Sequence, residues 1–162
     1  MNNVLSAEAI LPCLLDRLCD DEPENRKESH YRQSLTLAHY RRSVLRDLSW
    51  LLNTASHTTS EHLDDFPEVA ASVLDYGTPD FCGKTVTTLD RSSMETDVAD
   101  SIAKFEPRIV KRTLSVKVVP EVNKVSPNLI AFEIRGTMWA NPIPEQFQIE
   151  TKLDLETGAV NF

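Results

Sequence analysis

The chain has 162 residues, 41% hydrophobic and 26% charged, which is typical of one globular domain. Its formal net charge is −8, and residues 54–100 hold two basic against ten acidic residues, so the clustered Lys and Arg needed for nucleic-acid binding are absent. No apolar run approaches the roughly 20 residues of a membrane-spanning helix, so we expect no membrane insertion.

Residues 1–33 are predicted to form a tail outside the main domain of residues 34–162. Its apolar stripe at helical spacing consists of Leu11, Leu14, Leu15 and Leu18. The stretch 20–29 that follows is polar and lacks periodicity, as in a linker. The stripe therefore belongs either to a helix that docks on a partner or to a poorly ordered end.

Two features of the sequence bear on the compartment. No basic residue precedes Arg17, which is unlike a secretory signal. The three cysteines, Cys13, Cys19 and Cys82, cannot all pair with one another and form no CxxC motif. We therefore expect a reduced, cytosolic environment.

The apolar pattern predicts three helices before residue 106. The first runs from Ser34 to Asn53, with its stripe at Leu37, Tyr40, Val44, Leu45, Leu48, Leu51 and Leu52. Pro67 opens a second, short helix that stops at Tyr76-Gly77. Ser92 and Glu95 have the spacing of a capping box, which predicts a third helix from Ser92 to Phe105.

From Ile109 the period changes from 3.6 to 2, which indicates strands with one exposed face. The alternating apolar positions are Leu114, Val116 and Val118, then Ile130, Phe132 and Ile134, then Phe147, Ile149, Thr151, Leu153 and Leu155. Turns are expected at 123–128 and 141–144, and a short last strand within 159–162. The fold class is therefore α+β, with N-terminal helices packed on a C-terminal antiparallel β-meander.

Few residues are arranged for chemistry. The four histidines, His30, His39, His57 and His62, are scattered without the spacing of metal ligands, so we expect no metal site. Cys82 is more typical of a small buried residue than of a nucleophile. Two carboxylates can hydrolyse a glycoside, with Glu106 as the acid and Asp75 or Asp80 as its partner. The guanidinium of Arg108 disfavours that role, because a nearby positive charge lowers the pKa of a carboxyl group.

The stretch Phe105-Glu106-Pro107-Arg108 is the most distinctive local feature. Pro107 ends the third helix and turns the chain into the first strand. One interpretation is a helix-to-strand junction with a local salt bridge, which contributes about 0–1 kcal/mol if it is exposed. The other is a preorganised charged corner that docks on a partner.

Four segments, taken in order, resemble the GPW family of tailed-phage baseplate wedge proteins, and within it the TssE branch of type VI secretion. They are Leu51–Thr54, Ser72–Gly77 with Pro79–Phe81, Ile102–Arg108, and Pro144–Glu145 before Phe147–Asp154. The element Leu14–Leu18 is similar to the N-terminal segment of the TssE branch. The resemblance covers the chain from about Leu11 to Phe162.

The resemblance implies a structural subunit without catalytic activity or cofactor. Such a subunit joins TssF-like, TssG-like and TssK-like wedge subunits and helps to start a sheath of TssB-like and TssC-like subunits. It acts in the cytoplasm, at an apparatus docked on the inner membrane. Partner binding by the family's corner falls here on Glu106, Pro107 and Arg108.

Two other functions stay open at this point, a muramidase-type hydrolase that uses Glu106 and an adaptor that docks through its N-terminal helix. The strand around residues 146–155 is expected at or next to a sheet edge, where another strand can add. Its exposed residues Gln148, Glu150 and Lys152 would then face the first sheath subunit. The alternative is that residues 159–162 cover this edge.

Overall fold

The computed structural model describes residues 13–19, 36–57, 63, 65–84, 90–119, 128–140 and 144–162. Helices precede strands along the chain, which confirms the α+β class. The helices are α1 (Leu14–Leu18), α2 (Leu37–Leu52), α3 (Pro67–Ala70) and α4 (Arg91–Phe105), with 3-10 turns η3 (Val73–Asp75) and η4 (Lys111–Thr113). Most of the tail 1–33 lies outside the described residues, so the domain boundary at residue 34 stays a prediction.

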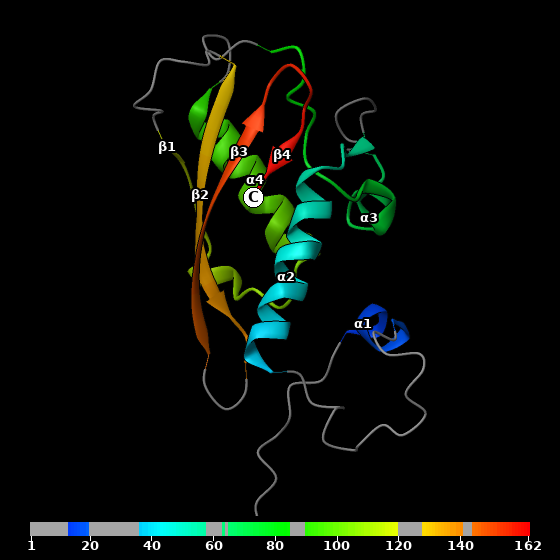
Figure 1. Cartoon of the computed structure of the whole chain (residues 1–162). Coiled ribbons are helices and arrows are strands. Elements are labelled where there is room, and N and C mark those ends of the chain that lie inside the picture. Colours follow the sequence, from blue (N-terminus) through cyan, green and yellow to red (C-terminus); the bar gives the residue numbers. More distant parts are fainter. Residues whose placement is uncertain are drawn as a thin grey trace, which may run out of the picture.

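The sheet is an antiparallel meander with strand order β1-β2-β3-β4. Its strands are β1 (Ser115–Val119), β2 (Leu129–Met138), β3 (Glu145–Asp154) and β4 (Val160–Asn161). Figure 1 shows α2 and α4 next to the sheet, with β4 close to α2. Burial alternates along β2 and β3 because one face packs on the helices. The predicted strands and the short last strand are confirmed, whereas the predicted turns fall largely outside the described residues.

Helix α2 begins three residues later than the sequence predicts. Thr36 is its N-cap, in extended conformation, and its hydroxyl accepts a hydrogen bond from the His39 N–H at 3.3 Å. A side-chain cap of this kind fixes the first turn. Most of the predicted stripe is buried, but Leu37 is 44% exposed because it lies in that first turn.

The second predicted helix is interrupted. α3 ends at Ala70, and Ser72 adopts an extended conformation before η3 begins. The Ser72 hydroxyl donates to the Val69 carbonyl and accepts from the Leu74 N–H, so it ends one turn and starts the next. A single helix up to Tyr76 is therefore wrong.

The start of α4 also differs from the prediction. Asp90, not Ser92, is the N-cap, and its carboxylate accepts from the Ser92 N–H at 3.1 Å. The expected capping partner Glu95 instead accepts from the Val118 N–H at 2.7 Å. The capping-box interpretation is wrong because this carboxylate serves an outward backbone donor of β1. The predicted end of the helix at Phe105 is confirmed.

The core lies between the two long helices and the sheet. α2 contributes Val44, Leu48 and Leu51, α4 contributes Met94, Val98 and Ile102, and the sheet contributes Ile130, Phe132, Ile134, Phe147 and Leu153. Leu48, Ile102 and Ile134 have no exposed surface. Removing one of these side chains would leave a cavity that costs about 2–5 kcal/mol.

At Gly77 the segment after η3 lies directly against the segment after α2, with which it forms a parallel bridge at Ala55 and Thr78. Its φ is +135°, and a Cβ there would overlap the Thr54 carbonyl oxygen and lie 2.9 Å from the Ala55 carbonyl carbon. This closeness permits the bonds from Thr78 N–H to the Thr54 carbonyl (2.8 Å) and from Ser56 N–H to the Thr78 carbonyl (2.9 Å). Only glycine fits this position without strain.

We predict that Gly77→Ala lowers the free energy of unfolding well beyond the roughly 1–2 kcal/mol of an unfavourable backbone conformation. The control is Gly83→Ala, because Gly83 also has positive φ (+74°) but a Cβ there meets nothing within 4 Å. Urea unfolding measures both variants. Equal losses would contradict the close contact between the two segments at Gly77.

Candidate functional site

The stretch after α4 forms a corner centred on a nearly buried carboxylate. Glu106 is 3% exposed and caps α4, with its N–H bonded to the Ile102 carbonyl. Its carboxylate accepts from Arg108 Nε at 2.7 Å, from Arg108 Nη2 at 2.5 Å and from the Arg108 backbone N–H at 3.1 Å. The guanidinium and carboxylate are therefore paired in a two-pronged arrangement, which is strong and directional.

Arg108 also reaches across to α2. Its Nη2 lies 2.5 Å from Asp47 Oδ2, and its Nη1 donates to Ser43 Oγ at 3.2 Å. Ser43 and Asp47 are four residues apart and so share one face of the helix. One arginine thus links the end of α4 to the middle of α2.

The network continues outward to the N-terminal helix. Arg46 Nε donates to Asp47 Oδ1 at 2.8 Å, and Arg46 Nη1 donates to Asp16 Oδ1 of α1 at 2.5 Å. The Cys13 thiol also donates to Asp16, at 2.9 Å. Five charged groups therefore run from Asp16 to Glu106, and we call them the charged strap.

The charged strap shifts the pKa values of its members. Burial of the Arg108 guanidinium alone lowers its pKa, but the bonds and charges of Glu106 and Asp47 outweigh burial and raise it. Burial raises the pKa of Asp16, yet the bonds from Cys13 and Arg46 prevail, and its pKa lies below the usual value. Arg108 thus stays charged over the whole pH range in which proteins fold.

This geometry corrects the expectation of an exposed charged corner. Glu106 is buried, Arg108 is half-buried, and only Pro107 is exposed. The reason is that Ser43 and Asp47 supply partners that the local sequence does not reveal. The spacing of those two residues beside the apolar stripe of α2 is the one signal that could have shown them.

The charged strap also leaves little room for hydrolysis by Glu106. Both of its carboxylate oxygens already bond to Arg108, and a substrate oxygen would need to approach a side chain that is almost fully covered. Of the expected partners, Asp75 is bonded to Lys104 at 3.0 Å, and Asp80 accepts from the Cys82 N–H.

The strand predicted at or next to the sheet edge is β3. Its outer edge, on the side away from β2, is paired with β4 over only part of its length. β4 pairs only with Lys152 and Leu153. The Asp154 N–H points outward to the Ala159 carbonyl, whereas the Leu155 N–H points to Asn128 before β2. Because the direction alternates, the backbone groups of Gln148 and Glu150 point outward with that of Asp154. Gln148, Glu150 and Lys152 also expose their side chains on the face away from the helices.

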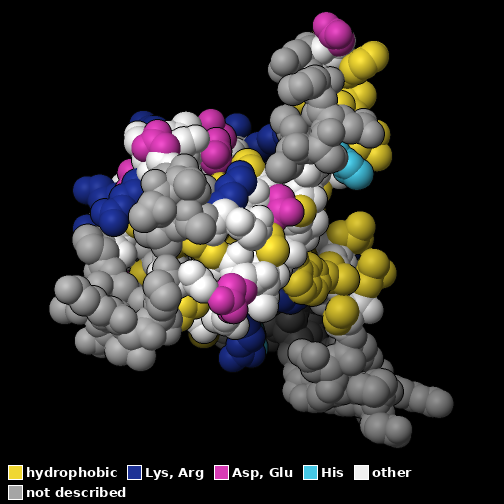
Figure 2. Space-filling model, turned by 90° about the horizontal axis from the view of Figure 1, so that it is seen from above, with side chains coloured by type: hydrophobic (Ala, Val, Ile, Leu, Met, Phe, Trp, Pro, Cys, Tyr) yellow, Lys and Arg dark blue, Asp and Glu magenta, His cyan; other side chains and the backbone are white. Residues whose placement is uncertain are grey.

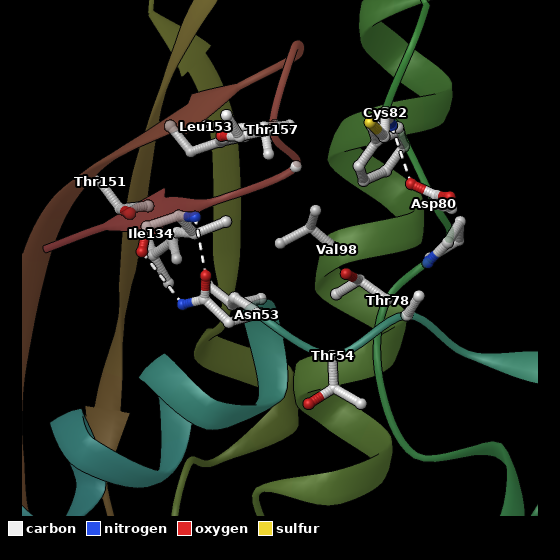
Figure 3. A pocket seen from close by; sticks show the side chains of 17 residues that line it. Asn53, Thr54, Thr78, Asp80, Cys82, Val98, Ile134, Thr151, Leu153 and Thr157 are labelled. Carbon is white, nitrogen blue, oxygen red and sulfur yellow. Dashed lines mark hydrogen bonds between the residues drawn. The ribbon is translucent and has the colours of Figure 1, made fainter.

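On the two outermost strands, β1 and β4, side chains bind outward backbone groups at Val118 and Val160. Glu95 binds the outward N–H of Val118 on β1. On β4, the Asn53 amide donates to the Val160 carbonyl at 3.0 Å and accepts from the Val160 N–H at 2.9 Å, as Figure 3 shows. Within the described residues, no strand pairs with the outer edge of β3 from residue 145 to 150.

Beside Asn53 lies a cavity of about 300 Å³ that the sequence does not predict. The end of α2, the loop 78–82, α4 and the sheet line it, with Thr78, Val98 and Leu153 among the side chains drawn in Figure 3. Its polar groups include Asp80 and Cys82, which bond to each other through the Cys82 N–H. The Cys82 thiol donates to the Glu156 carbonyl at 3.2 Å.

The N-terminal helix α1 rests on α2 through charge rather than through apolar packing. It buries no residue, and Leu14, Leu15 and Leu18 are 69%, 38% and 74% exposed. Leu11 lies outside the described residues. Within the described part of the chain, no His, Cys, Asp and Glu side chains cluster in a way that could hold a metal ion, and no helix is long and apolar enough to cross a membrane.

We predict that Arg108→Ala lowers the free energy of unfolding by about 3–5 kcal/mol, because it leaves the buried Glu106 carboxylate unpaired. The matched control is Arg135→Ala, since Arg135 also pairs with a glutamate two residues earlier, Glu133, at 2.7 Å but is 57% exposed. That variant should cost under about 1 kcal/mol. Urea unfolding that gave the two variants equal losses would show that the charged strap adds little to the fold.

We predict that a chain beginning at Ser34 keeps a cooperative unfolding transition, with a midpoint within a few degrees of the parent. The reason is that α1 contributes no buried residue. Trp50 reports the loss of α1, because the Arg46 guanidinium that binds Asp16 also lies 5.0 Å from the Trp50 ring centre. Aggregation of the shortened chain would instead mean that the leucines cover the core.

Comparison with known proteins identifies the family. The family model described as baseplate wedge protein gp25 matches residues 38–143, more than half of the chain. This match spans α2, α4, the Glu106–Arg108 corner and strands β1 and β2. No curated protein and no solved structure matches the chain. The chain therefore belongs to the GPW/gp25 family of baseplate wedge proteins.

Proposed function

We propose that this protein is the TssE-like wedge subunit of a type VI secretion baseplate and helps to start the contractile sheath. Membership of the baseplate wedge family supports a structural role among other baseplate proteins. The secretion-system context is inferred from the similarity of Leu14–Leu18 to the TssE branch. The proposal includes TssF-like, TssG-like and TssK-like neighbours in the wedge.

The sheath-initiating role is supported by a difference between the edge strands, namely which of their outward backbone groups have partners. Glu95 binds the outward N–H of Val118 on β1, and Asn53 binds the N–H and the carbonyl of Val160 on β4. The outer edge of β3 keeps its backbone groups at Gln148 and Glu150 without a described strand partner. An incoming strand of a TssB-like or TssC-like subunit could pair there by β-augmentation.

The side chains on this edge suit a selective partner. Gln148 Nε2 donates to Glu133 Oε1 at 2.5 Å, and Arg135 donates to the same oxygen at 2.7 Å. These polar and charged side chains disfavour pairing with an arbitrary strand, because an incoming strand must place compatible side chains next to them. We infer that a sheath subunit brings polar groups that match these residues.

The corner has a different part in the proposal. Pro107 is its exposed residue, while Glu106 and Arg108 set the position of the turn through the charged strap. A wedge neighbour would thus contact Pro107 and the accessible side of Arg108. We place this assembly in the cytoplasm, at an apparatus docked on the inner membrane.

We predict that Glu150→Pro folds normally but stops sheath nucleation, because proline removes one outward backbone donor. Glu150→Ala is the matched control, since it removes the same side chain and keeps the N–H. Wedges reconstituted with either variant are mixed with TssB-like and TssC-like subunits, and sheath is counted by electron microscopy. Sheath formation by the proline variant at the level of the alanine variant would contradict the edge role.

A further inference from the structure

Residues 65–76, which we call the projection, expose large apolar side chains away from the core. The projection contains α3 and η3, and Figure 1 shows it beyond α2 on the side away from β1. Val73 is 80% exposed, Leu74 66% and Phe66 59%. In Figure 2, hydrophobic side chains gather along the side on which Figure 1 places α1 and α3, while the opposite side is mixed in charge.

The projection is anchored at its base. Asp75 is 4% exposed and pairs with Lys104 of α4 at 3.0 Å. The Tyr76 ring meets the Phe105 ring edge-on, with centroids 5.1 Å apart. Because the base is fixed to α4, Val73 and Leu74 are held outward in a defined arrangement, which lowers the entropy cost of binding.

The backbone of the projection is not available for strand pairing. The carbonyl of Phe66 accepts from the N–H groups of Val69 and Ala70, and that of Val73 accepts from the Tyr76 N–H. A partner must therefore bind through side chains. Large exposed apolar groups at three positions of one short segment suit the apolar stripe of an amphipathic helix.

The charges around the projection indicate which charged residues the partner helix should carry. No Lys or Arg occurs between Arg46 and Lys84, whereas this stretch holds seven Asp and Glu. Asp65 and Glu68 are exposed beside Phe66. These carboxylates favour a partner with Lys and Arg around its apolar stripe, and they disfavour an anionic lipid surface.

We propose that the projection is a docking surface for a basic amphipathic helix of another protein, with Phe66, Val73 and Leu74 as its apolar anchors. The inference rests on the proposed wedge function only for the setting in which such a partner would occur. The docking chemistry itself comes from the exposure and charge of residues 65–76.

The test uses the full chain and a labelled synthetic helix of Leu and Lys, about 18 residues or five turns long. Fluorescence anisotropy at physiological salt should show binding. The double variant Val73→Ser with Leu74→Ser should bind at least about tenfold more weakly, because such anchors dominate binding. Val119→Ser, which changes an exposed valine at the end of β1, should bind like the parent.

A second pair of variants separates docking from adsorption by net charge. Glu68→Lys should weaken binding of the Leu/Lys helix, whereas Asp100→Lys on the exposed surface of α4 should not. A Leu/Glu helix of equal length should fail to bind the parent. Equal weakening by the two lysine variants would overturn the proposal, and so would full binding by the double serine variant.

Two further results would also overturn it. One is a dimer, detected by light scattering, that the double serine variant abolishes, because the occupant would then be a second copy. The other is sedimentation with phosphatidylcholine–phosphatidylglycerol vesicles that the same variant abolishes. If the parent chain does not bind the Leu/Lys helix but still assembles into wedges, this inference is refuted. The proposed function would not be contradicted by that result.

Discussion

The two-pronged pairing of Glu106 with Arg108 is the contact on which the arrangement of helices and sheet depends. It lies where α4 turns into the segment before β1, and Arg108 carries it across to Asp47 on α2. The Arg108 carbonyl also accepts from the Trp139 N–H at 2.7 Å, just after β2. One residue therefore ties both long helices to the sheet, and a buried pair of this kind fails badly when one partner is lost.

With the helices fixed in this way, the edges of the sheet become unequal. α4 brings Glu95 to the outer edge of β1, and the end of α2 brings Asn53 to β4. β3 is paired on both sides only near Lys152 and Leu153. The helices thus bind outward backbone groups on β1 and β4, whereas no described strand pairs with residues 145–150 of β3, and the proposed role rests on this difference.

The regular elements were predictable because their apolar periods are long and clear. Helices up to Leu52 and Phe105 and the three main strands follow from periods of 3.6 and 2. The start of α4 was not predictable, because Asp90 and Ser92 are both good N-cap residues. Which of them caps the helix depends on Glu95 binding Val118, which lies 23 residues away in sequence. The break at Ser72 likewise comes from one hydroxyl that serves two turns.

The sequence could predict which residues form the candidate site, but not that they are buried. The order of local motifs singles out Glu106, Pro107 and Arg108, yet their partner Asp47 lies 61 residues away from Arg108. Local sequence cannot show that such distant groups meet. For the same reason, the closure of the β4 edge by Asn53, 107 residues before Val160, becomes visible only in the fold.

Residue-resolved amide hydrogen exchange of β3, in the free chain and after sheath addition, tests the account most directly. In the free chain, the N–H groups of Gln148 and Glu150 should exchange fast, while that of Ile149, which points to β2, should be protected. After sheath addition, Gln148 and Glu150 should become protected as well. If both amides exchange equally fast before and after addition, the open edge of β3 is not where the sheath begins.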